Sequence, residues 1–294
     1  MKRFFIICGL AALALAAVSC NDAHGPMETE TFHWADSTAY AYMTLDAEMP
    51  SGKDKVASEV RRGLADVVDG ILSKVTSYEN ERFFGPYTGS PDDVQGMLIY
   101  YRDSSFAQIA RMSQADAEER ARYISESADL SDEEKQYLED YPRWGYEFGL
   151  KKLDENDRYV VFQSMDYIYM GGAHGGVTGA GCLTFSKKDG RRVTDFVDAS
   201  RAADMQPLLQ AGVVSYYKDM GVDTSWDELK ESLFIEDGFI PLPSWPVYPC
   251  ADGLAFVYQQ YEIASYAEGM PCFTVPYADI APYLTPEAKA LLGL

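Results

Sequence analysis

Apolar side chains alternate with polar or tyrosine side chains over residues 40–49, close to the start of the regular patterns in the chain. A period of two is typical of a strand with one buried face. Residues 56–75 instead carry valine, leucine or isoleucine at every third or fourth position, which predicts an amphipathic helix. Gly63 lowers the helix propensity there but allows close packing on a sheet. The alternating residues are Met43, Leu45, Ala47 and Met49.

Residues 92–141 combine a helical pattern with many acidic side chains. Ser131 and Glu134 have the spacing of a capping box, and Pro142 follows the expected end of the helix. Acidic positions on a helix are most simply a solvated face rather than a ligand site. We therefore interpret this stretch as an acidic helical insertion.

Strand patterns dominate the region after the insertion. Residues 144–170 predict a hairpin that turns at residues 154–157, and residues 179–193 predict a second strand pair. We expect a helix from Asp195 to about Met220 and a second, capped helix that starts at Ser225. Three strands are then predicted near residues 244–250, 254–259 and 272–275. A last helix is capped at Thr285. No regular β–α–β alternation is present. The pattern predicts an α+β fold in which a mainly antiparallel sheet packs with helices.

The first twenty residues follow the pattern of an export signal. Lys2 and Arg3 precede an apolar stretch, Phe4–Val18, that is shorter than the roughly 20 residues of a membrane-spanning helix. Residues 17–20 resemble a bacterial lipobox, in which the cysteine, here Cys20, is lipidated and becomes the mature N-terminus. The alternative is an ordinary secretory signal. We expect an exported protein, lipid-anchored to the bacterial envelope at its periplasmic face or the cell surface.

Four parts follow from these patterns. We predict a signal peptide at residues 1–19 and a polar tether at 20–37. A small N-terminal strand–helix unit with the acidic insertion spans 38–142, and a larger α+β domain spans 143–294.

The chain is strongly acidic. Its 294 residues include 25 Lys and Arg against 46 Asp and Glu, a net charge of −21. Loss of Lys2 and Arg3 on processing leaves 23 basic against 46 acidic residues, a net charge of −23. Such acidity argues against nucleic-acid binding and against docking on an anionic membrane through a basic patch. We therefore expect membrane contact only through the lipid anchor, and either a basic partner or none.

Cys8 is removed with the signal and Cys20 carries the lipid, which leaves three unmodified cysteines: Cys182, Cys250 and Cys272. An oxidising compartment permits a disulfide, and a Cys250–Cys272 bridge would stabilise the fold by roughly 3 kcal/mol. Buried thiols are the equally supported alternative. No C-x-x-C spacing indicates a zinc site, and we expect no metal and no cofactor.

Residues 167–176 read Y-I-Y-M-G-G-A-H-G-G. His174 could act as a general base or metal ligand, but the only other histidines, His24 and His33, lie in the predicted tether, and no H-E-x-x-H occurs. We prefer a structural histidine in a glycine turn and assign no catalytic residue. No nucleophile elbow, Walker A or dinucleotide fingerprint is present either.

Tyrosines cluster near the end of the chain, where Tyr258, Tyr261 and Tyr266 surround Glu262. If these rings are exposed, they would stack on sugars or anchor a protein partner. Buried, they are core residues with hydrogen-bonded hydroxyls, which we favour.

Together the two motifs resemble an extracytoplasmic domain of unknown function, DUF3298, over roughly residues 155–285. Residues 38–76 resemble, more weakly, the small companion domain that often precedes it. The family pattern has proline where this chain has Gln260. The matching residues are Tyr167, Tyr169, Gly171, Gly172, Ala173, His174, Gly175, Gly253, Leu254, Phe256, Tyr258, Tyr261, Glu262, Ile263, Ala264, Tyr266, Ala267, Gly269, Val275, Pro276 and Tyr277.

The resemblance implies binding rather than catalysis. The same domain is the outer part of the RsiV anti-sigma factor, which binds lysozyme, and lies beside the separate catalytic domain of PdaC. We expect a non-catalytic envelope binding protein with lysozyme-like proteins or peptidoglycan as candidate ligands, since a basic protein such as lysozyme would be attracted by the charge of −23. The alternatives are a cell-wall hydrolase or esterase using His174, or a purely structural lipoprotein. The expected binding residues are His174, Tyr167, Tyr169, Tyr258, Tyr261, Glu262 and Tyr266.

Overall fold

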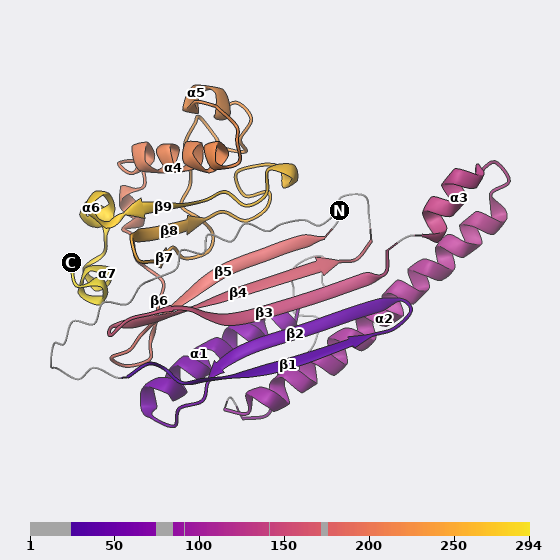
Figure 1. The fold of residues 1–294 in the computed structure, drawn as a ribbon, viewed down its shortest axis with the longest axis horizontal. Coiled ribbons are helices and arrows are strands. Elements are labelled where there is room, and N and C mark those ends of the chain that lie inside the picture. Colours follow the sequence, from indigo (N-terminus) through magenta and orange to yellow (C-terminus); the bar gives the residue numbers. More distant parts are fainter. Residues whose placement is uncertain (1–24, 75–84, 91, 141, 172–175) are drawn as a thin grey trace.

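The computed structural model describes residues 25–74, 85–90, 92–140, 142–171 and 176–294. A six-stranded sheet dominates this part of the chain (Figure 1). Every neighbouring pair is antiparallel except β2 and β3, which run parallel. The fold is therefore α+β with a mainly antiparallel sheet, as the sequence patterns predict. In sheet order, the strands are β1 (Thr29–Ser37), β2 (Ala41–Pro50), β3 (Trp144–Glu155), β4 (Tyr159–Tyr169), β5 (Val177–Ser186) and β6 (Arg192–Val193).

Two helices, α1 (Lys55–Leu72) and α2 (Val94–Glu126), cover one face of this sheet. The alternating residues of β2 are buried in the core that the helices form with the sheet. Gly63 of α1 lies directly on the Phe185 ring, because a Cβ at this position would be 2.7 Å from it. The predicted close packing of helix on sheet is thus confirmed.

A second unit with its own apolar core follows β6, and Figure 1 shows it beside β5. The predicted helix starts at Ser225 and Thr285 are confirmed. The unit consists of η1 (Ala199–Arg201), α4 (Gln206–Asp219), α5 (Trp226–Leu229), β7 (Tyr248–Pro249), β8 (Gly253–Val257), η2 (Tyr266–Glu268), β9 (Cys272–Pro276), α6 (Tyr277–Ile280), η3 (Ala281–Tyr283) and α7 (Pro286–Leu292). Strands β7, β8 and β9 form a small antiparallel sheet.

Part of the predicted tether is instead a strand. Residues 29–37 form β1, which pairs along its whole length with β2. Phe32 and Trp34 pack against the core, and Trp34 makes an edge-to-face contact with Phe106. The other positions of this edge strand are mostly exposed, so the run looks polar in sequence.

Two further predicted boundaries are wrong. The helix expected from Asp195 begins at Gln206, because Pro207 has no backbone N–H to donate and fits only the first helical turn. The strand expected over residues 244–250 is reduced to β7, since Pro243 and Pro246 cannot donate to a sheet.

The acidic insertion is helical, as predicted, and extends beyond the sheet. Ser113 donates a hydrogen bond to the Tyr40 carbonyl at the end of the sheet, at 2.7 Å, and is the last buried residue of α2. The remaining 13 residues of α2 add about 20 Å of helix, and α3 (Asp132–Glu139), which has no buried residue, folds back beside them (Figure 1). We call residues 114–140 the acidic arm. Within the described ranges, no helix is long and apolar enough to cross a membrane.

The three body cysteines are thiols in the structure, so the disulfide alternative is not the one observed, and the alternative of three buried thiols holds only for Cys182, because Cys250 is partly buried and Cys272 is exposed. The register of the small sheet explains why Cys250 and Cys272 are not bridged. Cys250 hydrogen-bonds to Gly253 at one end of β8, whereas Cys272 pairs with Val257 at the other end. Four residues of strand, about 13 Å, separate the two positions along β8, beyond the reach of a disulfide.

Candidate functional site

The two sequence motifs meet at Gly176, between the large sheet and the second unit. The Tyr266 hydroxyl donates a hydrogen bond to the Gly176 carbonyl at 2.7 Å. The Tyr167 ring lies over the same glycine, because a Cβ there would be 2.2 Å from the ring. Only glycine allows this approach. Residues 90 positions apart therefore form one contact region, which we call the junction.

Glutamine side chains close the edge of β5 at the junction. Strand β6 pairs only with Thr184 and Phe185, so among the described residues no strand pairs with the first half of β5 on that side. Gln259 accepts from the Ala180 backbone N–H at 3.0 Å and donates to the Ala180 carbonyl at 2.7 Å. Gln260 accepts from the N–H of Thr178 at 2.8 Å. These side-chain amides substitute for a neighbouring strand.

Glu262 positions backbone at the junction. Its carboxylate accepts from the backbone N–H of Gln259 at 2.7 Å and from that of Ser244 at 2.5 Å. The second contact fixes the loop that carries Trp245, whose indole lies on Gly181 so closely that a Cβ there would be 1.7 Å from the ring. Glu262 thus holds the loop that packs on the sheet.

Two of the predicted binding tyrosines are core residues. Tyr258 is fully buried and donates to the Pro241 carbonyl at 2.8 Å. Tyr169 is buried at the end of β4. The preferred interpretation of the tyrosines as core residues with hydrogen-bonded hydroxyls holds for Tyr258.

Tyr261 is different, because 52% of its surface is exposed. Its backbone has φ +65°, a left-handed conformation that costs a non-glycine residue about 1–2 kcal/mol. The Tyr261 and Tyr266 rings lie 5.9 Å apart between centroids. Among the predicted tyrosines, it is the one whose ring reaches solvent most fully.

A partly buried carboxylate, Asp166 on β4, was not predicted from the sequence. It lies over Gly179 of β5, whose Cβ would be 2.6 Å from an Asp166 carboxylate oxygen. Burial raises the pKa of Asp166 to about 6. Two hydroxyls on the same face, those of Tyr146 and Ser164, are buried without a hydrogen-bond partner among the described residues. The alternate glycines at 179 and 181 are the sequence signal of this site, because glycine in a strand often marks a close approach of other groups, here Asp166 on Gly179 and Trp245 on Gly181.

The predicted residues Cys20 and His174 lie outside the described residues. In the part of the chain that is described, no group of three or more His, Cys, Asp or Glu side chains could hold a metal ion. His33 lies on β1 and hydrogen-bonds to Asp46 of β2 at 2.6 Å. This contact joins an edge strand to its neighbour at an exposed position.

Comparison with known proteins identifies the second unit. Residues 199–278 match the model of a family described as a protein of unknown function, DUF3298. A DUF3298 family member from Bacteroides fragilis NCTC 9343 has a TM-score of 0.66 at 16% identity, covering 91% of this chain and 96% of that one. A DUF3298 family protein from Pseudomonas aeruginosa PAO1 has a TM-score of 0.53 at 15% identity, covering 90% and 97%. No curated protein matches the chain significantly.

Because their sequence identities to this chain are low, the two solved structures show a shared fold and nothing more. The matched range is narrower than residues 155–285 and includes the tyrosine motif but not the glycine–histidine segment. Residues 199–278 therefore match the DUF3298 family model, within a fold that the chain shares with solved members of that family.

Proposed function

We propose that this protein is a non-catalytic, lipid-anchored binding protein of the bacterial envelope whose ligand is a basic protein of the lysozyme type. The observation that carries the proposal is the acidic arm, which extends into solvent beyond the sheet. The anchor rests on the lipobox ending at Cys20.

The acidic arm has the charge that a basic protein would recognise. Residues 114–140 contain ten acidic and three basic side chains, a net charge of −7. Such a field steers a basic ligand toward the arm and speeds association. The ligand can approach freely, because no residue of the arm is buried.

Two exposed tyrosines provide apolar contacts within this charge. Tyr123 of α2 and Tyr137 of α3 are 54% and 64% exposed. Tyrosine is enriched among residues that dominate binding energy at protein interfaces. An exposed tyrosine within an acidic surface suits a ligand with both basic and apolar groups.

Internal contacts stabilise the arm in the absence of a hydrophobic core. Asp116 and Arg120 form an ion pair one helical turn apart. Ser131 and Glu134 form the predicted capping box. A helix that is polar all round depends on such local pairs, so the arm is a solvent-facing helical element.

Calorimetric titration with lysozyme at 50 and 200 mM salt tests the proposal. We expect the triple variant Glu119→Gln, Glu126→Gln and Glu133→Gln to bind about tenfold more weakly at 50 mM, at roughly 0.5 kcal/mol per charge. The charge-matched control neutralises three exposed acids of the second unit and should retain most of the affinity. Its substitutions are Asp223→Asn, Glu231→Gln and Glu236→Gln.

Lack of lysozyme binding by the wild-type protein at 50 mM salt would rule out this ligand. Equal weakening by both triple variants would rule out the arm as the binding site and leave only a general charge effect. Sedimentation with purified peptidoglycan tests the glycan alternative. Binding to the glycan that survives 200 mM salt, together with no binding to lysozyme, would favour that alternative.

A further inference from the structure

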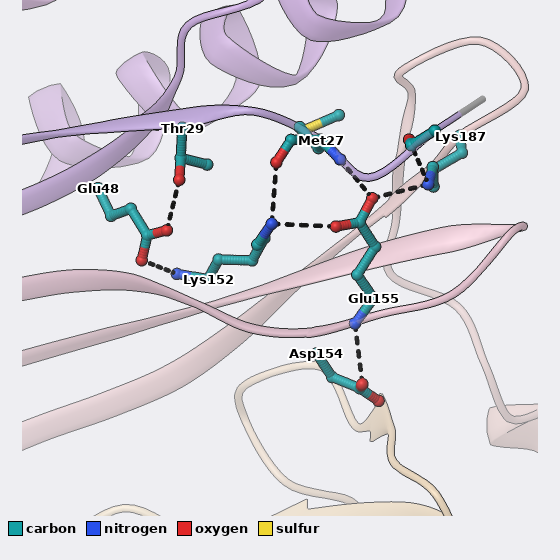
Figure 2. Close-up of polar contacts among 8 residues, drawn as sticks. Met27, Thr29, Glu48, Lys152, Asp154, Glu155 and Lys187 are labelled. Carbon is teal, nitrogen blue, oxygen red and sulfur yellow. Dashed lines mark hydrogen bonds and ion pairs between the residues drawn. The ribbon is translucent and has the colours of Figure 1, made fainter. Parts of the chain in front are cut away.

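An ion-pair network of the buried Lys187 with the partly buried Glu155 and Lys152 holds the first described residues of the chain against the sheet (Figure 2). The Lys187 side chain, only 4% exposed, donates to Glu155 at 2.7 Å and to the Gly25 carbonyl at 3.1 Å. Lys152 donates to the other Glu155 oxygen at 3.0 Å and to the Met27 carbonyl at 2.8 Å. The Met27 N–H donates to Glu155 at 2.7 Å.

A β-bulge makes this network possible. The pairing of β3 with β4 shifts by one residue between Lys152 and Asp154. Lys152 and Glu155 are three apart and would point to opposite faces of a regular strand, but the extra residue places both on one face. Glu48 of β2 accepts from the backbone N–H of Lys152 at 2.9 Å.

The network keeps Glu155 ionised. Burial opposes ionisation, but the hydrogen bonds from Lys187, Met27 and Lys152 outweigh it and lower the pKa of the Glu155 carboxyl below its usual value. The charges therefore persist at neutral pH. Backbone groups of Gly25 and Met27 are held by charge-assisted hydrogen bonds, which are stronger than neutral ones.

The segment that this network holds, residues 25–27, lies at the end of the sheet that carries two turns, residues 156–158 and 187–192. The first turn has one basic and one acidic side chain, and together the two turns have five basic and two acidic side chains, so we call them the basic turns. A pocket of about 210 Å³ is lined by Gly25, Met27, Lys187 and Val56 near the start of α1. Residues 187–192 include four basic side chains and one acidic side chain, a net charge of +3 in a chain of −21.

A larger hollow of about 760 Å³ opens between the same turns and α7. Arg158, Lys188 and Arg191 are exposed around it. The acidic residues Asp157, Asp189 and Glu287 also line the hollow, and Arg191 forms an ion pair with Glu287. The turns thus combine exposed cations with local counter-charges.

The chain length between the anchor and this end is short. Five Cα-to-Cα steps separate Cys20 from Gly25, which limits their separation to roughly 18 Å. Electrostatic attraction is largely screened beyond one Debye length, about 8 Å at physiological salt, so it acts once the cations come closer to the lipid surface than the full length of this segment. The basic turns are thereby kept close to the head groups of the lipids that hold the anchor.

We propose that the basic turns face the bilayer, with Arg158, Lys188 and Arg191 contacting anionic lipid head groups. The inference rests on the lipid anchor of the proposed function and deepens it. It also departs from the expectation, drawn from the net charge of the whole chain, that the membrane is contacted only through the anchor, because the charge is unevenly distributed and residues 187–192 carry +3. The acidic arm leaves the opposite end of the sheet, where Ser113 contacts Tyr40. Roughly 40 Å of β3 and about 20 Å of helix separate the arm tip from the basic turns. The arm is then presented away from the membrane, toward a ligand.

Energy transfer in reconstituted vesicles tests this orientation. The lipidated protein, in a Cys250→Ser and Cys272→Ser background, carries one donor dye at Asp157→Cys or at Ala128→Cys. Vesicles of phosphatidylcholine with about 30% phosphatidylglycerol carry a head-group acceptor. We expect at least twofold more efficient transfer from position 157 than from position 128. Equal transfer, or more from position 128, would overturn the proposed orientation.

The contribution of the cations is measured with a charge variant and its control. The combined substitutions Arg158→Gln, Lys188→Gln and Arg191→Gln should at least halve the difference between positions 157 and 128. The combined substitutions Arg201→Gln, Lys218→Gln and Lys230→Gln in the second unit should leave it unchanged. The proposed head-group contact would be refuted if only the second set of substitutions reduced the difference, or if neither set reduced it.

Failure of the anchor is distinguished by mass spectrometry of the N-terminal peptide. An unlipidated Cys20 would refute both the proposed anchor and this inference. A lipidated Cys20 with no difference between the two dye positions would refute only the orientation.

Discussion

Replacing Glu155 by glutamine tests how strongly the buried network holds the N-terminal segment. The amide keeps the size of the side chain but removes the negative charge between two lysines. Lys152 is 25% exposed and can turn toward water, whereas Lys187 is enclosed. Glu155→Gln therefore leaves Lys187 as a buried cation without its carboxylate.

The unpaired charge of Lys187 determines how much the free energy of unfolding is expected to fall. Removing one partner of a buried ion pair destabilises proteins by about 3–5 kcal/mol. The glutamine oxygen can still accept from Met27, so we expect about 3 kcal/mol. For a chain of this size, 1 kcal/mol corresponds to roughly 2 °C in Tm, which gives a decrease of about 6 °C at pH 7.

The assay is thermal unfolding followed by circular dichroism, with Glu287→Gln as the matched control. This control breaks the ion pair of Glu287 with Arg191, in which both side chains are exposed. Exposed pairs contribute at most about 1 kcal/mol. The double variant Glu155→Gln with Lys187→Met should recover most of the loss, because the buried charge is then absent as well.

The pH dependence provides an independent check. The pKa of Glu155 is lower in the folded than in the unfolded protein. Its stabilising contribution is therefore present above the unfolded value of about 4.3 and is lost as pH falls through the folded pKa. The gap between wild type and Glu155→Gln should close in acid. A Tm decrease no larger than that of Glu287→Gln, with no dependence on pH, would refute the reasoning.

Two further predictions concern Asp166 and the junction. Burial raises the pKa of Asp166 to about 6, above its unfolded value, so the folded protein loses stability as pH rises from about 4 to 6. Asp166→Asn should remove this loss and raise stability by up to about 3 kcal/mol at pH 7, with no gain at pH 4, in denaturant titrations at both pH values. A gain that is equal at both pH values would exclude the charge as its cause. Tyr266→Phe deletes the hydroxyl that donates to Gly176 and should cost about 1 kcal/mol in urea unfolding at unchanged m-value. Tyr261→Phe is the control, since the Tyr261 ring is exposed, and an equal cost for both variants would contradict a specific role for the Gly176 contact.

The sequence correctly predicted those helices and strands that show a regular spacing of apolar residues or a local capping motif. Strand β2 and helix α1 each bury one regular face, and the capping boxes at Ser131 and Ser225 mark real helix starts. The parallel pairing of β2 with β3 could not be read in this way. It joins residues about 100 positions apart and depends on which strands the helices between them bring together.

Contacts between residues far apart in the sequence also limited the prediction of the site. Strand β1 looked polar because an edge strand needs few inward side chains, here Phe32 and Trp34. The function of Gln260 was hidden because its partner, Thr178, is 82 positions earlier. A departure from the family pattern is visible in sequence, but the hydrogen bond that it provides is visible only in three dimensions.

The junction separates residues that support the fold from those open to a ligand. Tyr266, Glu262 and Gln259 direct side-chain polar atoms to backbone groups of the chain, and these contacts join the second unit to β5 and to the Trp245 loop. Tyr261 is half exposed and retains a left-handed backbone that glycine would adopt at lower cost. Strain of this kind persists where the surrounding structure enforces it and is concentrated at functional sites. Within this motif, Tyr261 is therefore the predicted binding residue whose side chain is left open to solvent, while its neighbours fix the surrounding backbone through their hydrogen bonds.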